Sequence, residues 1–301
     1  MLNTSQLFPF LISGLAFGAV YAMSGTGLLV LYRTTGVLNF AFGAIGAMGA
    51  NITWHLIEKT EWCPDWLAYV ACVVVSAALT LLYGVVFAPR FANRDPLGKM
   101  LGTLAFALIL LGLMFNLWRS QDARGFRLPT GTRRFEIFDA RVTWTQVVAV
   151  LFALLVVGGV TIFLRATKIG TAMRAIANDR EISSLLGVPV RRVETAAWLG
   201  SGVLCGIVGL LLVDLFGSLD MVLMTWFVIP SLAPVLIGQM RYLWVTFFAA
   251  FVIGVVEAEL NASNWGWPSQ YRKTTAYVFA VGALLWFARK RTIMISGRAT
   301  R

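Results

Sequence analysis

The sequence predicts an all-α protein that crosses a membrane eight or nine times. Hydrophobic residues make up 58% of the 301 residues and charged residues only 13%, whereas an average soluble protein is roughly 25% charged. A membrane-spanning helix needs about 20 apolar residues, and nine long stretches of this chain lack Asp, Glu, Lys and Arg. They are residues 1–32, 34–57, 66–89, 100–118, 142–164, 195–213, 221–240, 242–256 and 274–288.

The first two stretches decide which side of the membrane holds the N-terminus. Residues 1–32 are too long for the apolar core of a signal peptide and no basic segment precedes them, so we expect a retained membrane helix. Residues 37–57 carry Gly43, Gly46 and Gly49, and glycines at this spacing indicate close helix packing or an interrupted helix. If this segment crosses fully, the N-terminus lies outside; if it dips in and returns, the N-terminus lies inside.

The later stretches carry local signals of packing and bending. Two glycine pairs with a spacing of four predict seams where helices approach closely: Gly14 with Gly18 and Gly202 with Gly206. Pro230 and Pro234 are expected to kink or break the helix in 221–240, because proline has no N–H to donate. Glu257 directly follows the short stretch 242–256, and we interpret it as the solvated end of that helix.

The basic residues are unevenly distributed along the chain. The net charge is +11, and four predicted helices between residue 193 and the C-terminus place these two points on the same side. That side holds 16 of the 25 basic residues, although the loop 119–141 on the opposite side carries six. By the positive-inside rule the side with the excess, including the C-terminus, is cytoplasmic. The positive charge therefore indicates membrane orientation and not nucleic-acid binding.

Motifs for catalysis and metal binding are missing from the sequence. It contains no H-E-x-x-H, no G-x-S-x-G and no phosphate-binding G-x-x-x-x-G-K-[ST] loop. His55 has no metal-ligating residue at a suitable spacing, and Cys63, Cys72 and Cys205 form no disulfide or metal framework. An ion-coupled carrier usually keeps an acidic residue near the middle of a membrane-spanning helix, and none of the predicted spans has one there. We expect no metal site, no cofactor bound by this chain and no enzymatic activity, so energy for any pumping must come from another protein.

A polar segment, "GTAMRAIANDREISSLLGVPVRRV" at residues 170–193, interrupts the apolar pattern. Asn178 with Glu181 three residues later predicts a capping-box start of a helix. Gly187 followed by Pro189 predicts its end. A helix of about eight residues is too short to be stable alone in water, so it must pack against something.

This short helix has two interpretations. It could be an ordinary surface helix in a cytoplasmic loop, or a docking helix in which Ile182, Leu185 and Leu186 are the anchors buried by a partner. Three arginines would then form a polar rim: Arg180, Arg191 and Arg192. The predicted docking segment comprises Asn178, Asp179, Arg180, Glu181, Ile182, Leu185, Leu186 and Gly187.

The same segment resembles the cytoplasmic loop of the permease subunits of ATP-binding-cassette importers for branched-chain amino acids, the LivH type. In that family the loop has the pattern Glu-Ala-Ala, three residues, Gly. Glu181 and Gly187 match it, whereas Ile182 and Ser183 replace the two alanines. Nearly the whole chain is similar to the family in order. The similar parts include "GLAFGAVYAMSGTGLLVLYRTTGVLNFAFGAIGAMGA" (14–50) and "QYRKTTAYVFAVGALLWFARKR" (270–291), while "LIGQMR" (236–241) departs from the family's Gly-Gly turn.

This resemblance implies a function, a set of partners and a location. The chain would be a non-catalytic permease subunit in the inner (plasma) membrane of a prokaryote, a single transmembrane domain over residues 1–301 with a coupling loop at about 165–195. Its partners would be a second homologous permease, two cytoplasmic ATPases that use the ATP, and an extracytoplasmic substrate-binding protein. A stand-alone secondary carrier or channel, and a membrane enzyme or scaffold, remain the alternatives.

The resemblance also points to residues that could line the translocation path. Asn39 and Gly43 match the family pattern Gly-x-x-Asn-Phe-Ala-His-Gly, but Phe42 stands where the family has histidine, which implies a less polar route. A buried carboxamide in lipid needs a polar partner, which favours a pore-lining role for Asn39. Helix packing is the alternative explanation for the whole segment.

Overall fold

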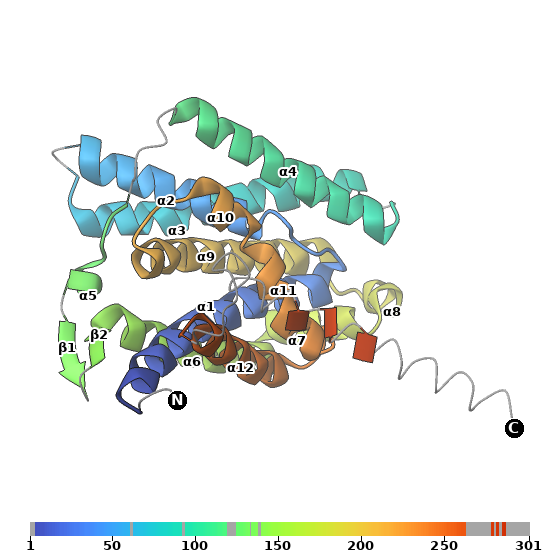
Figure 1. Ribbon diagram of the computed structural model, residues 1–301. Helices are drawn as coiled ribbons and strands as arrows, with labels where there is room; N and C mark the ends of the chain where they lie inside the picture. Colours follow the sequence, from blue (N-terminus) through green and yellow to red (C-terminus); the bar gives the residue numbers. More distant parts are fainter. Residues whose placement is uncertain are drawn as a thin grey trace, which may run out of the picture.

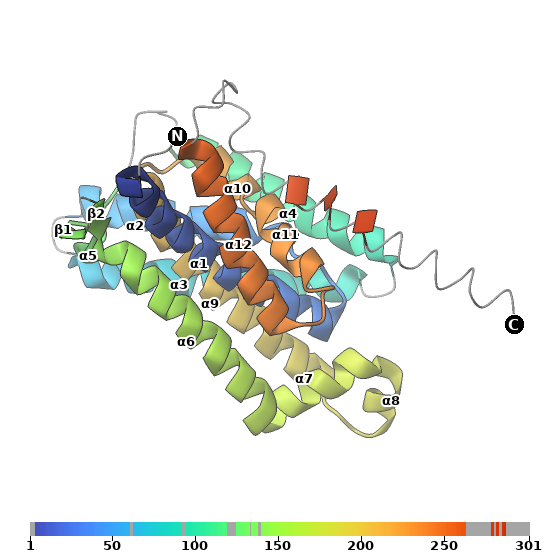
Figure 2. The ribbon, with the colours of Figure 1, turned by 60° about the horizontal axis from the view of Figure 1, so that its bottom comes forward.

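The structure, a computed structural model, is a bundle of long helices (Figures 1 and 2). It describes residues 4–60, 63–91, 94–118, 125–132, 134–137 and 140–262, together with 278–279, 281–282 and 285–286. A short β-hairpin lies at one end of the bundle and the small helix α8 lies near the other.

Among the described residues, six helices are long and apolar enough to cross a membrane. They are α1 (Thr4–Thr35), α3 (Asp65–Leu82) extended by η1 (Tyr83–Phe87) and η2 (Ala88–Phe91), α4 (Pro96–Leu117), α6 (Trp144–Ala166), α9 (Val190–Phe216) and α12 (Leu243–Ala262). With the shorter apolar helices described below, they confirm a polytopic all-α membrane protein. Most of the predicted helix at 274–288 falls outside the described residues.

The connection between α4 and α6 contains a small feature that the sequence did not suggest. It consists of α5 (Pro129–Thr132), β1 (Arg134–Ile137) and β2 (Ala140–Thr143). The two strands pair antiparallel, with Arg134 opposite Thr143. The Thr143 N–H donates a hydrogen bond of 3.0 Å to Oε1 of Gln146, which fixes the start of α6.

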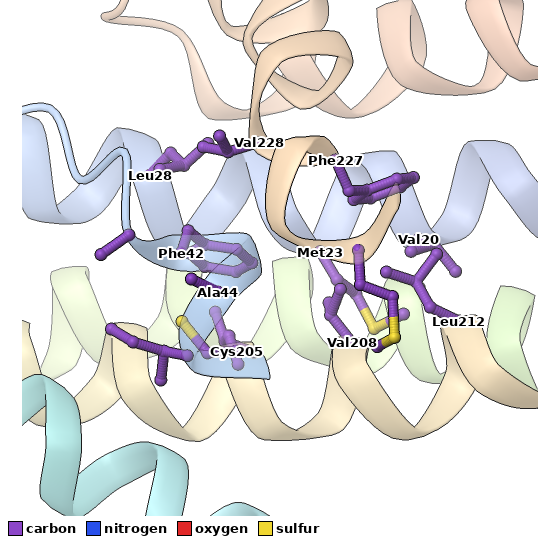
Figure 3. Packing of buried hydrophobic residues seen from close by; sticks show 14 of the residues in the cluster. Val20, Met23, Leu28, Phe42, Ala44, Cys205, Val208, Leu212, Phe227 and Val228 are labelled. Carbon is purple, nitrogen blue, oxygen red and sulfur yellow. The ribbon is translucent and has the colours of Figure 1, made fainter. Parts of the chain in front are cut away.

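Helices α1 and α9 form the centre of the bundle. In their most apolar windows 83% and 61% of residues are buried, against 17–33% in the other four long helices. Figure 3 shows Val20 and Met23 of α1 near Val208 and Leu212 of α9. The outer helices instead expose apolar side chains such as Leu155 of α6, which is 69% exposed, as expected for surfaces that face lipid.

Helix α2 (Phe42–Lys59) contains the three glycines of the glycine-rich second segment. It is a single helix of 18 residues, about 27 Å long at 1.5 Å per residue. It runs antiparallel to α3 without turning back: the Thr53 hydroxyl donates to the Ala68 carbonyl at 3.1 Å, and the Ser76 hydroxyl to the Ile45 carbonyl at 3.4 Å. The helix itself does not turn back, but α2 is not among the six described helices that are long and apolar enough to cross a membrane, so a full crossing by this segment stays a prediction.

The glycines predicted as packing seams are confirmed as such. A Cβ at Gly18 would lie 2.8 Å from the Cα of Phe251 in α12, and one at Gly206 would lie 2.7 Å from the Cα of Val73 in α3. Only a residue without a side chain allows these backbones to approach so closely. The glycines of α2 meet three helices in turn, because Gly43 faces α10, Gly46 faces α9 and Gly49 faces α3.

The stretch 221–240 is broken into α10 (Met221–Trp226) and α11 (Val228–Ile237). Pro230 cannot donate to the carbonyl of Trp226, and its ring crowds that carbonyl, so the helix is interrupted at Phe227. This confirms the expected break. Pro234 lies inside α11 without interrupting it.

The turn after α11 takes the conformation that glycine favours, although no glycine occupies its left-handed positions. Gln239 and Met240 have φ of 54° and 53°. The Met240 N–H donates to the Val235 carbonyl at 2.9 Å, the hydrogen bond of a helix-ending Schellman motif. The segment 236–241, which lacks the Gly-Gly turn of the family it resembles, thus forms a left-handed turn from other residues.

We expect Gln239→Gly to stabilise the protein by about 1 kcal/mol, because a left-handed conformation costs a non-glycine residue about 1–2 kcal/mol and the added flexibility of the unfolded chain offsets part of that gain. The Gln239 side chain is exposed, so little packing is lost. Thermal unfolding in detergent measures the change. Gln239→Val is the matched control and should lower stability, and equal unfolding temperatures for both variants would contradict the prediction.

Candidate coupling site and substrate path

Helices α7 (Lys168–Asn178) and α8 (Arg180–Leu185) form a compact unit between α6 and α9. The Thr167 hydroxyl caps α7 by accepting from the Gly170 N–H at 2.9 Å. A Cβ at Gly170 would clash with the Phe163 carbonyl and lie 2.6 Å from the Cα of Leu164, so the sharp turn from α6 requires glycine. Met173 and Ile176 are 3% and 5% exposed and belong to the apolar core, so α7 is packed firmly onto the bundle.

The capping residue of α8 differs from the prediction. Asn178 is the last residue of α7, and Asp179 caps α8 instead, because its Oδ1 accepts from the Ile182 N–H at 2.9 Å. The predicted capping box between Asn178 and Glu181 is therefore wrong, and the helix has six residues where about eight were expected. Glu181 lies exposed in the first turn, where the helix dipole favours a negative charge.

Gly187 ends α8 as predicted. Its φ is +81°, which L-residues other than glycine rarely adopt. The Val188 N–H donates to the Ser183 carbonyl and the Gly187 N–H to the Ser184 carbonyl, both at 3.1 Å. This Schellman pair, with the Asp179 cap at the other end, holds a helix that is too short to persist alone.

The apolar face of α8 is directed away from the other described helices. Ile182, Leu185 and Leu186 are 56%, 86% and 79% exposed, whereas Ser183 is only 4% exposed and faces the bundle. Arg180 forms an ion pair with Glu194 of α9. The remaining rim residues, Arg191 and Arg192, are exposed at the start of α9. The predicted anchors are thus exposed on one face of α8, and the predicted rim arginines are exposed in α8 and at the start of α9.

Asn39, Phe42 and Gly43 also lie together, but in the interior of the chain. Asn39 is 2% exposed, its Oδ1 accepts from the Ala41 N–H at 3.0 Å, and its Nδ2 has no hydrogen-bond partner among the described residues. Phe42 is 1% exposed and packs near Leu28 and Ala44 (Figure 3). A Cβ at Gly43 would clash with the Met224 carbonyl and lie 2.5 Å from that of Thr225. Close packing against α10 thus explains why position 43 requires glycine. A path-lining role for Asn39 and Phe42 stays a prediction.

The sequence did not reveal a pair of polar side chains that joins α1 to α12. The Tyr21 hydroxyl of α1 donates a hydrogen bond of 2.8 Å to Oε2 of Glu257 in α12. Both residues line a cavity of about 490 Å³. The sequence predicts Glu257 only as a solvated helix end, whereas its half-buried carboxylate also accepts a hydrogen bond from a neighbouring helix.

The described residues contain no group of three or more His, Cys, Asp or Glu side chains that could hold a metal ion. His55 is exposed, with its ring edge toward Trp118 at 6.4 Å. Cys72 and Cys205 are fully buried. None of these residues contributes to the surfaces described above.

Comparison with known proteins identifies the kind of protein that carries these features. The family described as "Branched-chain amino acid transport system / permease component" matches residues 10–288. The high-affinity branched-chain amino acid transport system permease protein LivH of Escherichia coli (strain K12) is 22% identical over 285 residues, covering 91% of this chain and 92% of LivH. The probable LivH protein of Methanocaldococcus jannaschii is 27% identical over 276 residues, with 86% and 84% covered.

One relative carries a different substrate in its name. The fructose import permease protein FruG of Bifidobacterium longum is 24% identical over 302 residues, with 95% of this chain and 84% of FruG covered. The family match nevertheless spans almost all of the described bundle, from α1 to beyond α12. The chain therefore belongs to the family of permease components of branched-chain amino acid transport systems, and it is a multi-pass membrane protein.

Proposed function

We propose that this chain is half of the translocation path of an ATP-driven importer for branched-chain amino acids or a similar small solute. Its relatives LivH of Escherichia coli and LivH of Methanocaldococcus jannaschii are named for branched-chain amino acid transport. The observation that carries the coupling role is the exposed apolar face of α8, which is fixed at both ends and which none of the described residues covers. Water-exposed leucines at 86% and 79% indicate a surface that a partner covers.

The expected partners are those implied by the resemblance to importer permeases. Two cytoplasmic ATPases would each seat one α8, a second homologous permease would complete the path, and an extracytoplasmic binding protein would deliver the substrate. The charge distribution supports a cytoplasmic position for α7, α8 and the C-terminus. With nine crossings, the N-terminus would then be outside.

The contacts of α7 and α8 explain how a movement of the ATPase would reach the path. Arg180 ties α8 to Glu194 in the first turns of α9, and the buried face of α7 packs into the core. Helices α1 and α9 are the most buried long helices. Closure of the ATPases would therefore move the centre of the bundle and not only a peripheral loop.

Co-purification tests this proposal directly. The C-terminus is tagged, membranes of the native host are solubilised in mild detergent, and proteins recovered with the permease are identified by mass spectrometry. Recovery of an ATPase and a second permease in comparable amounts is expected. A protein that is reproducibly free of any ATPase and transports in vesicles without ATP would contradict the proposal and favour a stand-alone carrier.

Substitutions on α8 make the test specific to the docking surface. The double variant Leu185→Asp, Leu186→Asp should recover at least about tenfold less ATPase per permease, because buried anchors dominate binding energy. Ser184→Asp, on the same helix and exposed, is the matched control and should recover wild-type amounts. Equal ATPase recovery with all variants would show that α8 is only a surface helix.

A further inference from the structure

The cavity beside Tyr21 and Glu257 lies between α1, α12, the end of α9 and the broken helix α10–α11. Its volume of about 490 Å³ falls in the range typical of small-molecule sites, roughly 300–1,000 Å³. Aromatic side chains form much of the described wall: Phe10, Phe17, Tyr21, Phe216, Trp226 and Phe227. A solute with an aliphatic side chain would find an apolar surface of matching character.

One carboxylate faces this aromatic cavity among the described residues. Tyr21 is 4% exposed, its ring stacks on Phe227 with centroids 5.1 Å apart and planes within 5°, and its hydroxyl donates to Glu257. The stacked ring and the hydrogen bond fix the direction of the carboxylate. The cavity thus combines a wall of π faces, which attract cations, with one oriented negative group.

Glu257 lies in the stretch Leu243–Leu260 of α12, which is long and apolar enough to cross a membrane. It lies 14 residues beyond Leu243, the first residue of α12, which corresponds to about 21 Å at 1.5 Å per residue. The hydrocarbon core is about 30 Å thick. With the start of α12 on the cytoplasmic side, Glu257 lies in the outer part of the bilayer. An acidic side chain at such a depth is costly and is usually retained for a function.

The neighbouring backbone is also irregular at this point. The break between α10 and α11 occurs at Phe227, and Trp226, Phe227 and Pro230 all line the cavity. In membrane transporters, discontinuous helices commonly surround the substrate, because irregular backbone is tolerated where it lines a cavity. The cavity, the carboxylate and the helix break are three separate observations at one place.

We propose that this cavity is an outward-facing substrate site in which Glu257 binds the ammonium group of an amino acid and the aromatic wall contacts its aliphatic side chain. This inference rests on the proposed function as an importer permease. It adds that the permease itself selects for a positively charged amino group, which a neutral sugar lacks. Tyr21 acts as a positioning residue that orients the carboxylate.

A labelling experiment tests binding without relying on transport. Ser13, which lines the cavity, is changed to cysteine in a Cys63→Ser background, since the other two cysteines are buried. Right-side-out vesicles are treated with a membrane-impermeant maleimide in the presence of leucine or of 4-methylpentanoate, which has the same carbon skeleton but no amino group. We expect labelling that leucine slows and 4-methylpentanoate does not, and we expect Glu257→Gln to remove the protection by leucine.

Each other labelling result overturns the inference. Absence of labelling would show that the cavity is closed to the outside. Equal protection by both compounds would show that no amino group is recognised, and absence of protection would show that leucine does not bind there. The co-purification experiment described above remains independent, so loss of the ATPase partner and loss of the substrate site give distinguishable results.

An uptake measurement provides a second readout. Glu257→Gln keeps the size and a hydrogen-bond acceptor for Tyr21 but removes the charge, and it should lower the maximal rate of leucine uptake at least about tenfold, as expected for loss of one member of a buried charged pair. Glu259→Gln, two residues along α12 and outside the cavity wall, is the matched control and should transport at the wild-type rate. Wild-type uptake by Glu257→Gln, at equal amounts of protein in the membrane, would overturn the assignment.

Discussion

Replacing Gly187 with leucine is expected to lower substrate uptake more than tenfold while leaving the amount of protein in the membrane unchanged. Gly187 adopts a φ of +81°, and this conformation costs other L-residues about 1–2 kcal/mol. Relief of that strain would break the hydrogen bond from Val188 to Ser183 that ends α8 and would displace Leu185 and Leu186 from the docking face. Uptake of radiolabelled leucine and immunoblotting of membranes measure the two quantities.

The surroundings of Gly187 make this variant specific to the backbone. A Cβ at this position would meet nothing within 4 Å, so the backbone conformation and not a clash of the Cβ is what disfavours leucine. Gly187→Asn is the matched control, because asparagine tolerates the left-handed conformation, and it should retain most of the uptake. Normal uptake by the leucine variant would remove the support for α8 as the coupling helix.

The large-scale features of the fold could be predicted because they depend on patterns local in sequence. Charge-free stretches long enough to cross lipid predict helices, glycine pairs predict close seams, and Pro230 predicts the break in 221–240. The exposed face of α8 was also predictable, since the spacing of Ile182, Leu185 and Leu186 and the stop at Gly187 are local signals.

Features that depend on tertiary packing could not be predicted in this way. Asn178 and Asp179 are both good helix caps, and the packing of Met173 and Ile176 of α7 into the core decides that α7 continues through Asn178. The pairing of Tyr21 with Glu257 joins residues 236 positions apart, which no local pattern encodes.

The second prediction with a large expected effect concerns Gly43 at the start of α2. A role in lining the path and a role in helix packing predict different results when this glycine is replaced. We expect Gly43→Val to prevent stable folding, because its Cβ would clash with the Met224 carbonyl and lie 2.5 Å from that of Thr225. Overpacking of a well-packed interior costs about 1–3 kcal/mol even where side chains can adjust, and backbone carbonyls adjust less. Size-exclusion chromatography of the detergent-solubilised protein should show aggregation and loss of the monodisperse peak.

A matched substitution separates this packing effect from a transport effect. Gly200→Val introduces the same side chain into α9, where a Cβ would meet nothing within 4 Å, and should leave the protein monodisperse. If Gly43→Val were also monodisperse but inactive in uptake, α10 must move away from α2 in the working protein, and Gly43 would line the path after all. Aggregation would instead establish that the close contact between α2 and α10 is required for folding, and helix packing would then be sufficient to explain the glycine at position 43.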